Sequence, residues 1–153
     1  MNSKLSPEQV QWHRDYYLKF TVDDSIVDFI LKYESLLTQD AWRGNCHVGK
    51  GWLPIVAKCF DKLLDLNLPD FKVVQVKEKF GRLVIYTSRL PTEHASILDL
   101  IINIAEAEAC KTCENCGAPH YEIRGNGWLK NYCDTCENDR NKARAKYNDL
   151  EAL

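Results

Sequence analysis

Two Cys-x-x-Cys pairs in the C-terminal third of the chain constrain its fold more than any other feature. The pairs are separated by sixteen residues, three of which are glycines. Thiolates in such tight turns are the usual ligands of one tetrahedral Zn²⁺, which then stabilises a segment too small to bury a core of its own. The sequence therefore predicts a zinc site whose ligands are Cys113, Cys116, Cys133 and Cys136.

The predicted site is structural rather than catalytic. Four cysteines complete the coordination sphere, whereas catalytic zinc keeps one position open for water or substrate. Two neighbours leave the ligand set open, because Cys110 lies three residues before the first pair and His120 lies four residues after it. Either residue could replace a ligand, but we expect Cys110 to be a buried thiol and His120 to lie on the surface.

Composition limits the class of protein. The chain has 153 residues, enough for one domain or for one domain with a small finger, and it lacks the apolar run of ~20 residues that a membrane helix needs. Its first residues lack the apolar stretch of a secretory signal. We therefore expect a cytoplasmic protein without membrane contact, in which seven cysteines favour metal binding over disulfides. The net charge of −2 provides no general attraction for nucleic acid.

Hydrophobic periodicity predicts a helix-rich α+β core over residues 1–111. Apolar residues recur at helical spacing in four segments, and the period changes to two around a β-hairpin at residues 71–88. Ser6 and Gln9 form a capping-box pattern at the start of the first helix. The predicted helices cover residues 7–20, 21–37, 52–67 and 93–111, residues 38–51 form a loop, and the hairpin strands cover residues 71–77 and 82–88.

The remaining residues, 112–153, form the predicted zinc finger. Residues 121–124 and 128–132 have the composition of two strands joined by a Gly-Asn-Gly turn, and a final helix is expected over residues 134–150. A helix that begins at the second ligand pair indicates a treble clef, and a zinc ribbon is the alternative. Because almost no linker precedes the finger, we expect it to pack on the core.

A glycine-rich stretch before the third predicted helix contains most of a phosphate-binding loop, Gly44-x-x-x-x-Gly49-Lys50. Such a loop needs Ser or Thr at the next position to hold Mg²⁺, and this position is Gly51. The segment before it has the composition of a polar helix end rather than of a buried strand. We therefore interpret these glycines as turn residues and do not expect nucleotide binding.

Two groups of cations are candidate surfaces for a protein partner or for nucleic acid. One group surrounds Phe80 at the hairpin tip, where the alternative is a solvated turn whose charges prevent aggregation. The other lies on the final helix, where alternate spacing is typical of a solvated helix. Trp128 and Tyr132 could stack on bases, although we expect them to fill the small core of the finger. The candidate cations are Lys77, Lys79 and Arg82 at the tip, and Arg140, Lys142, Arg144 and Lys146 on the helix.

The sequence shows no catalytic constellation. Its four histidines are scattered along the chain, and the His-Glu-x-x-His pattern of zinc peptidases does not occur. No nucleophile and base, and no pair of carboxylates, can be placed together from their spacing. We therefore do not expect an enzyme.

Several short motifs follow one another in a characteristic order between residues 46 and 137. They are Gly51-Trp52, Val76-Lys77-Glu78-Lys79-Phe80-Gly81-x-Leu83, Thr112-Cys113-Glu114-x-Cys116-Gly117-Ala118-Pro119, Arg124, Gly127-Trp128 and the last Cys-x-x-Cys. This order resembles a family of small, mostly uncharacterised proteins of phages, prophages and bacterial genomes. The family has no established activity, so the resemblance implies no catalytic residues, and residues 1–45 fall outside it.

These features favour a zinc-stabilised protein-binding module. The resemblance implies a phage-encoded effector that binds a host protein, such as a component of an antiviral defence system, and inhibits or redirects it. The alternative is a nucleic-acid-binding or transcription-associated zinc-finger protein whose final helix contacts the nucleic acid.

Overall fold

The structure is a computed structural model and describes residues 6–17, 24–38, 46–89 and 92–152. It confirms the helix-rich α+β class, with five α-helices in the described part and a four-cysteine cluster near the C-terminus. None of the described helices is long and apolar enough to span a membrane. In chain order the elements are α1 (Pro7–Tyr17), α2 (Asp24–Lys32), β1 (Cys46–His47), the 3₁₀-helix η1 (Lys50–Trp52), α4 (Leu53–Asp65), β2 (Val73–Lys79), β3 (Arg82–Thr87), α5 (Thr92–Ala109) and α6 (Asp134–Glu151).

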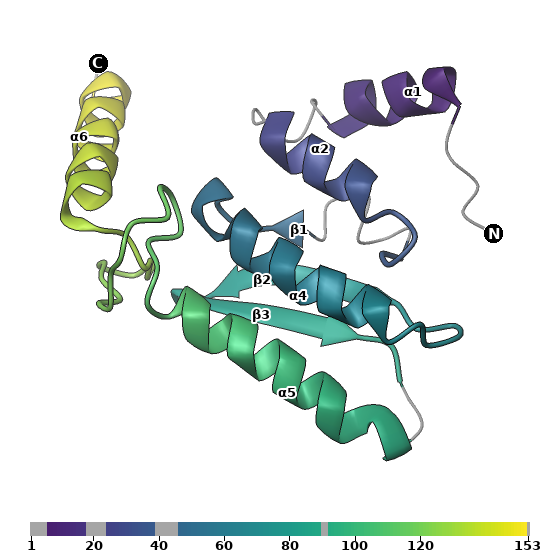
Figure 1. The fold of residues 1–153 in the computed structure, drawn as a ribbon. Coiled ribbons are helices and arrows are strands. Elements are labelled where there is room, and N and C mark those ends of the chain that lie inside the picture. Colours follow the sequence, from purple (N-terminus) through teal and green to yellow (C-terminus); the bar gives the residue numbers. More distant parts are fainter. Residues whose placement is uncertain (1–5, 18–23, 39–45, 90–91, 153) are drawn as a thin grey trace.

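The core lies between a three-stranded sheet and a layer of helices. Helices α4 and α5 lie side by side over one face of the sheet, and α2 packs against α4 (Figure 1). The apolar residues of α4 recur at intervals of three and four, which places them on one face of the helix. This face is buried in the core. The largest fully buried side chains of the core are Trp52, Tyr33, Phe60 and Leu63.

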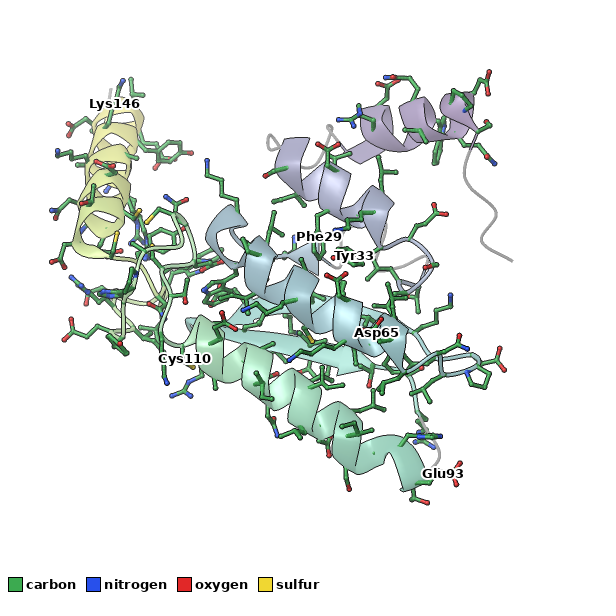
Figure 2. The ribbon with its side chains drawn as sticks, in the orientation of Figure 1. Phe29, Tyr33, Asp65, Glu93, Cys110 and Lys146 are labelled. Atoms are coloured by element: carbon green, nitrogen blue, oxygen red, sulfur yellow. The ribbon has the colours of Figure 1, made fainter. Side chains whose placement is uncertain are left out.

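Three aromatic rings join α2 to α4. The ring centroid of Phe29 lies 4.9 Å from that of Tyr33 and 5.5 Å from that of Phe60. Phe29 and Tyr33 lie between the two helices (Figure 2), and the Tyr33 hydroxyl donates a hydrogen bond of 2.8 Å to Asp61. Burial raises the pKa of Tyr33 to about 12, so this hydroxyl remains a donor across the physiological pH range.

The capping box at the N-terminus is confirmed. The Ser6 backbone N–H donates to the Gln9 side chain at 2.8 Å, and the Gln9 N–H donates to the Ser6 hydroxyl at 3.3 Å. The second helix is shorter than predicted and ends at Lys32. Beyond it, Leu36 accepts a hydrogen bond from Val73, so strand pairing with β2 replaces further helical turns. The predicted boundary between the first two helices, residues 18–23, lies outside the described residues.

The sheet has a strand that the sequence did not predict. Strand β1 falls inside the predicted loop 38–51 and pairs in parallel with β2, giving the strand order β1-β2-β3. Its two residues, Cys46 and His47, are too few to show an alternating pattern. The hairpin therefore gains its third strand from the segment before α4 rather than from the finger.

The β2–β3 hairpin ends in a two-residue turn formed by Phe80 and Gly81. Both residues have positive φ, 53° and 78°, which is the geometry of a type I′ turn and matches the twist of the strands. A Cβ atom at position 81 would lie 2.6 Å from Cγ2 of Ile123 in the finger. The hairpin tip thus touches the finger at a point where only glycine fits.

This contact predicts different stability effects for two glycine substitutions. Both Gly81 and Gly127 have positive φ, but a Cβ atom at Gly127 would meet no atom within 4 Å. Gly127→Ala should therefore lower the free energy of unfolding only by the backbone strain, about 1–2 kcal/mol. Gly81→Ala should cost a further ~1–3 kcal/mol from overpacking, as measured by chemical denaturation. Equal effects would show that the hairpin tip does not pack on the finger.

Candidate metal centre

Four cysteine sulfurs converge at one point between α5 and α6. They belong to Cys113, Cys116, Cys133 and Cys136, and all four sulfurs lie within 4.8 Å of one another. The first pair lies in a turn closed by a 2.9 Å hydrogen bond from the Gly117 N–H to the Cys113 carbonyl. The second pair begins α6, where Cys133 is the N-cap residue and Cys136 lies in the first turn. The predicted ligand set is therefore brought together.

The spacing of the sulfurs fits a tetrahedral metal ion. A regular tetrahedron with Zn–S bonds of ~2.3 Å has edges of ~3.8 Å. The sulfurs of Cys116 and Cys133 lie 3.7 Å apart, and none of the described cysteines forms a disulfide. Two further contacts favour thiolates, because the Cys133 N–H donates to Cys113 Sγ at 3.2 Å and the Asn115 amide donates to Cys136 Sγ at 3.3 Å. The chain can thus hold one metal ion here.

The pKa values of Cys133 and Cys136 are shifted in opposite directions. A backbone hydrogen bond from Cys136 lowers the pKa of Cys133 to about 7. The hydrogen bond from Asn115 lowers the pKa of Cys136, but burial and the other three cysteines outweigh it and raise this pKa to about 12. Four adjacent thiols cannot all ionise without a cation to balance their charge, so metal binding at this site releases protons.

Cys110 and His120, the two alternative ligands considered from the sequence, lie outside the cluster. Among the described residues, the cluster contains the four predicted cysteines and neither Cys110 nor His120. His120 Nε2 lies 2.9 Å from the Glu122 carbonyl and 3.2 Å from an Arg124 nitrogen. The segment His120-Tyr121-Glu122 has the His-x-Glu spacing of zinc deaminases. Its histidine is not among the grouped ligands, so this pattern carries no catalytic assignment.

A buried glutamate inside the first cysteine turn connects the finger to the core. Glu114 is only 2% exposed. Its Oε1 accepts a hydrogen bond of 3.1 Å from the Gly49 N–H, and its carbonyl accepts one of 2.8 Å from the Gly51 N–H. Its own N–H donates to the Asn131 carbonyl at 2.8 Å. One residue between two of the clustered cysteines thus binds both the core and the segment of the finger that precedes the second cysteine pair.

Lys130 neutralises this buried carboxylate and a second one from the hairpin. Its ammonium group lies 3.2 Å from Glu114 and 2.9 Å from Glu78, and all three side chains are largely buried. Burial raises the pKa of Glu114, and the charge of Lys130 opposes this shift. Burial alone would lower the pKa of Lys130, but hydrogen bonding to Glu78 and the charge of Glu114 raise it. The lysine is therefore charged and shared by two carboxylates.

Two further side chains hold the end of α5 against the finger. Asn131 is fully buried, and its amide donates to the carbonyls of Ala109 and Cys110 at 3.3 and 3.0 Å. These carbonyls lie at the C-terminus of α5, where Ala109 also accepts a hydrogen bond of 3.1 Å from the Thr112 N–H. Trp52 is also fully buried and donates to the Thr112 carbonyl at 2.9 Å. The contacts confirm that the finger packs on the core.

Gly49 and Gly51, from the stretch that resembles a phosphate-binding loop, allow the core to pack closely on the cysteine turn. A Cβ atom at Gly49 would lie 2.4 Å from the Glu114 carbonyl oxygen, and one at Gly51 would lie 2.4 Å from the Cys113 carbonyl oxygen. The expectation that these glycines serve turns is therefore incomplete, because close backbone approach to the cysteine turn is what requires them. Gly44 lies outside the described residues.

The predicted strands of the finger are reduced to a single bridge. Arg124 and Lys130 exchange two backbone hydrogen bonds of 2.9 and 2.8 Å. Apart from this bridge and one between Thr112 and Pro119, no strand pairing is present between residues 112 and 133 of the described chain. Directly after the bridge, the Asn131 carbonyl accepts a hydrogen bond from the Glu114 N–H instead of extending the ladder. The prediction that Trp128 fills a small core is wrong, since its side chain is 66% exposed. Tyr132 is half-buried, as expected.

The candidate cations of the final helix do not act as one group. Arg140 is turned inward, donates to the Trp128 carbonyl at 2.6 Å and to Glu137 at 3.2 Å, and lies over the Tyr132 ring. The other three are exposed, and α6 extends away from the remaining elements, with Lys146 near its far end (Figure 2). Their spacing places Lys142 and Lys146 on one side and Arg144 on the other. The exposed cations of α6 are thus distributed as on a solvated helix.

Comparisons of the chain with protein-family models, with curated proteins and with solved structures found no match. The resemblance to phage and bacterial proteins therefore stays a prediction.

The cysteine cluster predicts that each chain binds about one metal ion. Cys136→Ser should lose the metal, as measured by elemental analysis of the purified protein, because it removes one of four ligands. Cys110→Ser is the matched control, since Cys110 lies in the same region but outside the cluster, and this variant should retain full occupancy. Full occupancy in Cys136→Ser, or equal loss in both variants, would refute the assigned ligand set.

The shared lysine predicts a large stability effect. Lys130→Met leaves two buried carboxylates without a cation and should lower the free energy of unfolding by ~3–5 kcal/mol. Lys58→Met removes the exposed ion pair with Glu108, whose side chains are 64% and 42% exposed, and should change stability by less than ~1 kcal/mol. Chemical denaturation of both variants measures the difference. If Lys130→Met changed the free energy of unfolding as little as Lys58→Met, the ion pairs of Lys130 with Glu78 and Glu114 would not join the finger to the core.

Proposed function

We propose that this protein is a zinc-stabilised, non-catalytic protein-binding module. The donor set of four cysteines supports Zn²⁺ as the metal, because soft thiolates at tetrahedral spacing favour it and leave no open coordination position. The start of α6 at the second ligand pair supports a treble-clef finger over a ribbon. In this proposal the metal fixes the cysteine turn, and the turn forms one wall of the binding surface.

The observation that carries the proposal is an open cavity of about 710 Å³ between α2, the start of α4 and the cysteine turn. This volume is in the range of ligand-binding clefts. Its lining is mainly apolar and includes Phe29, Leu53, Pro54 and Ala57, and Asn115 and Cys116 form the wall on the finger side. An apolar side chain of a partner protein would fill this cavity, with the metal-stabilised turn on one side of it.

The charges around the cavity indicate an acidic partner. Among the described residues of the lining, Asp28 is the single acidic one, and it forms an ion pair of 2.5 Å with Arg14. Lys32 and Lys50 are exposed, and among the described residues neither has a carboxylate partner within salt-bridge distance. We therefore propose a partner segment in which an apolar side chain is flanked by Asp or Glu.

The resemblance described above supports a role as a phage-encoded effector in the cytoplasm. The partner would then be a host protein, and occupation of the cavity by a segment of that protein would inhibit or redirect it.

Capture of partners from the native host, combined with charge reversal, tests this proposal. Lys32→Glu/Lys50→Glu should abolish recovery of a protein partner that survives nuclease treatment, because both exposed lysines at the cavity become repulsive. Lys142→Glu/Lys146→Glu is the matched control, since it reverses two exposed charges on α6 and should leave recovery unchanged. A partner retained equally by wild type and the cavity variant, or recovery of nucleic acid alone, would refute the proposal.

A further inference from the structure

The strand register gathers the cations of the hairpin on one face of the sheet. Residues directly opposite one another on paired strands project to the same side. Lys79 is paired with Arg82, Lys77 with Val84, and Gln75 with Tyr86. The parallel pairing of β1 places His47 beside Lys77 on the same side. We call this set, His47, Gln75, Lys77, Lys79, Arg82, Val84 and Tyr86, the outer sheet face.

The opposite side of the sheet is the one that the helices cover. Val76 is paired with Ile85 and Glu78 with Leu83, and Val76, Ile85 and Leu83 are buried in the core beneath α4 and α5 (Figure 1). No described helix lies against the outer sheet face, whose residues are exposed or half-buried. The outer sheet face is therefore a surface rather than part of the core.

This face is positively charged although the chain as a whole has a net charge of −2. The only acidic residue within the described strands is Glu78, which projects to the other side and is paired with Lys130. Lys77, Lys79 and Arg82 form no ion pair within the described part of the chain. Three cations without carboxylates on one face attract a polyanion.

Two exposed aromatic rings lie among these cations. Tyr86 is 43% exposed, and the ammonium of Lys77 lies 5.3 Å from its ring centroid. Phe80, in the turn at the end of the face, is 68% exposed, and the ammonium of Lys79 lies 5.9 Å from its ring. Exposed rings beside cations provide stacking surfaces for bases next to contacts for phosphates. Rings and cations that alternate along one face match the alternation of bases and phosphates along a single strand, which favours nucleic acid as the occupant.

We propose that single-stranded nucleic acid binds across the outer sheet face. Bases stack on Tyr86 and Phe80, and phosphates contact Lys77, Lys79 and Arg82. A duplex is excluded as the ligand because its base faces are hidden within the stack, whereas unpaired bases are free to lie on a flat sheet. The outer sheet face shares no residue with the cavity between α2 and α4. The nucleic-acid site can therefore be tested independently of the proposed protein-binding function.

Fluorescence anisotropy with labelled oligo(dT) and oligo(U) of about 20 nucleotides tests the proposal. With three phosphate contacts, the logarithm of the association constant should fall against the logarithm of salt concentration with a slope of about −2. Lys77→Gln/Lys79→Gln/Arg82→Gln should weaken binding at least about tenfold at low salt. Lys142→Gln/Arg144→Gln/Lys146→Gln removes the same charge from α6 and should leave the affinity unchanged.

Stacking is tested separately. Tyr86→Ala should weaken binding about fivefold or more, whereas Tyr86→Phe keeps the ring and should retain it. A labelled poly-glutamate should bind much more weakly than either oligonucleotide. The proposal is overturned by absence of oligonucleotide binding, by equal losses in the two triple variants, by unchanged binding in a folded Tyr86→Ala variant, or by equal affinity for poly-glutamate. Binding of oligo(dT) alone or oligo(U) alone supports it and identifies the sugar that is preferred.

Discussion

The buried carboxylate of Glu114 and its contacts hold the structure together. This residue lies between two metal ligands, so its position is fixed by the cysteine turn, and its backbone and side chain accept hydrogen bonds from Gly51 and Gly49 of the core. A buried carboxylate without a cation would be strongly destabilising, which makes Lys130 part of the same unit. Glu114 thereby couples the cysteine cluster to the hydrophobic core, together with the contacts of Trp52 and Asn131.

Local patterns predicted the features that depend on local chemistry. The cysteine spacing identified the four cysteines that cluster, and the apolar periodicity identified the helices and the hairpin. The predictions that were wrong concern elements that depend on tertiary contacts. Strand β1 is too short to produce a pattern and pairs with the edge of β2. The finger strands are limited to the Arg124–Lys130 bridge, because the next residue, Asn131, accepts its backbone hydrogen bond from Glu114 and donates its side-chain amide to the end of α5. Tertiary contacts determine whether these elements form, and such contacts cannot be predicted from the local pattern of a single sequence.

Several residues of the motifs that resemble the phage and bacterial proteins also make tertiary contacts. Gly51, Glu78, Gly81 and Glu114 are far apart in the sequence, yet each lies at the junction between finger and core. These residues of the motifs therefore take part in the construction of this junction. Both candidate binding surfaces depend on it, because the cysteine turn forms one wall of the cavity and the hairpin tip, which ends the outer sheet face, rests on Ile123.

The central claim is that the metal-binding finger and the core form one cooperative unit. Hydrogen exchange of individual amides, in metal-loaded and chelator-treated protein, tests it most directly. The Gly49 and Gly51 amides belong to the core but donate to Glu114, so removal of the metal should reduce their protection together with that of residues 113–136. Loss of protection confined to the finger, with unchanged protection at Gly49 and Gly51, would contradict the account.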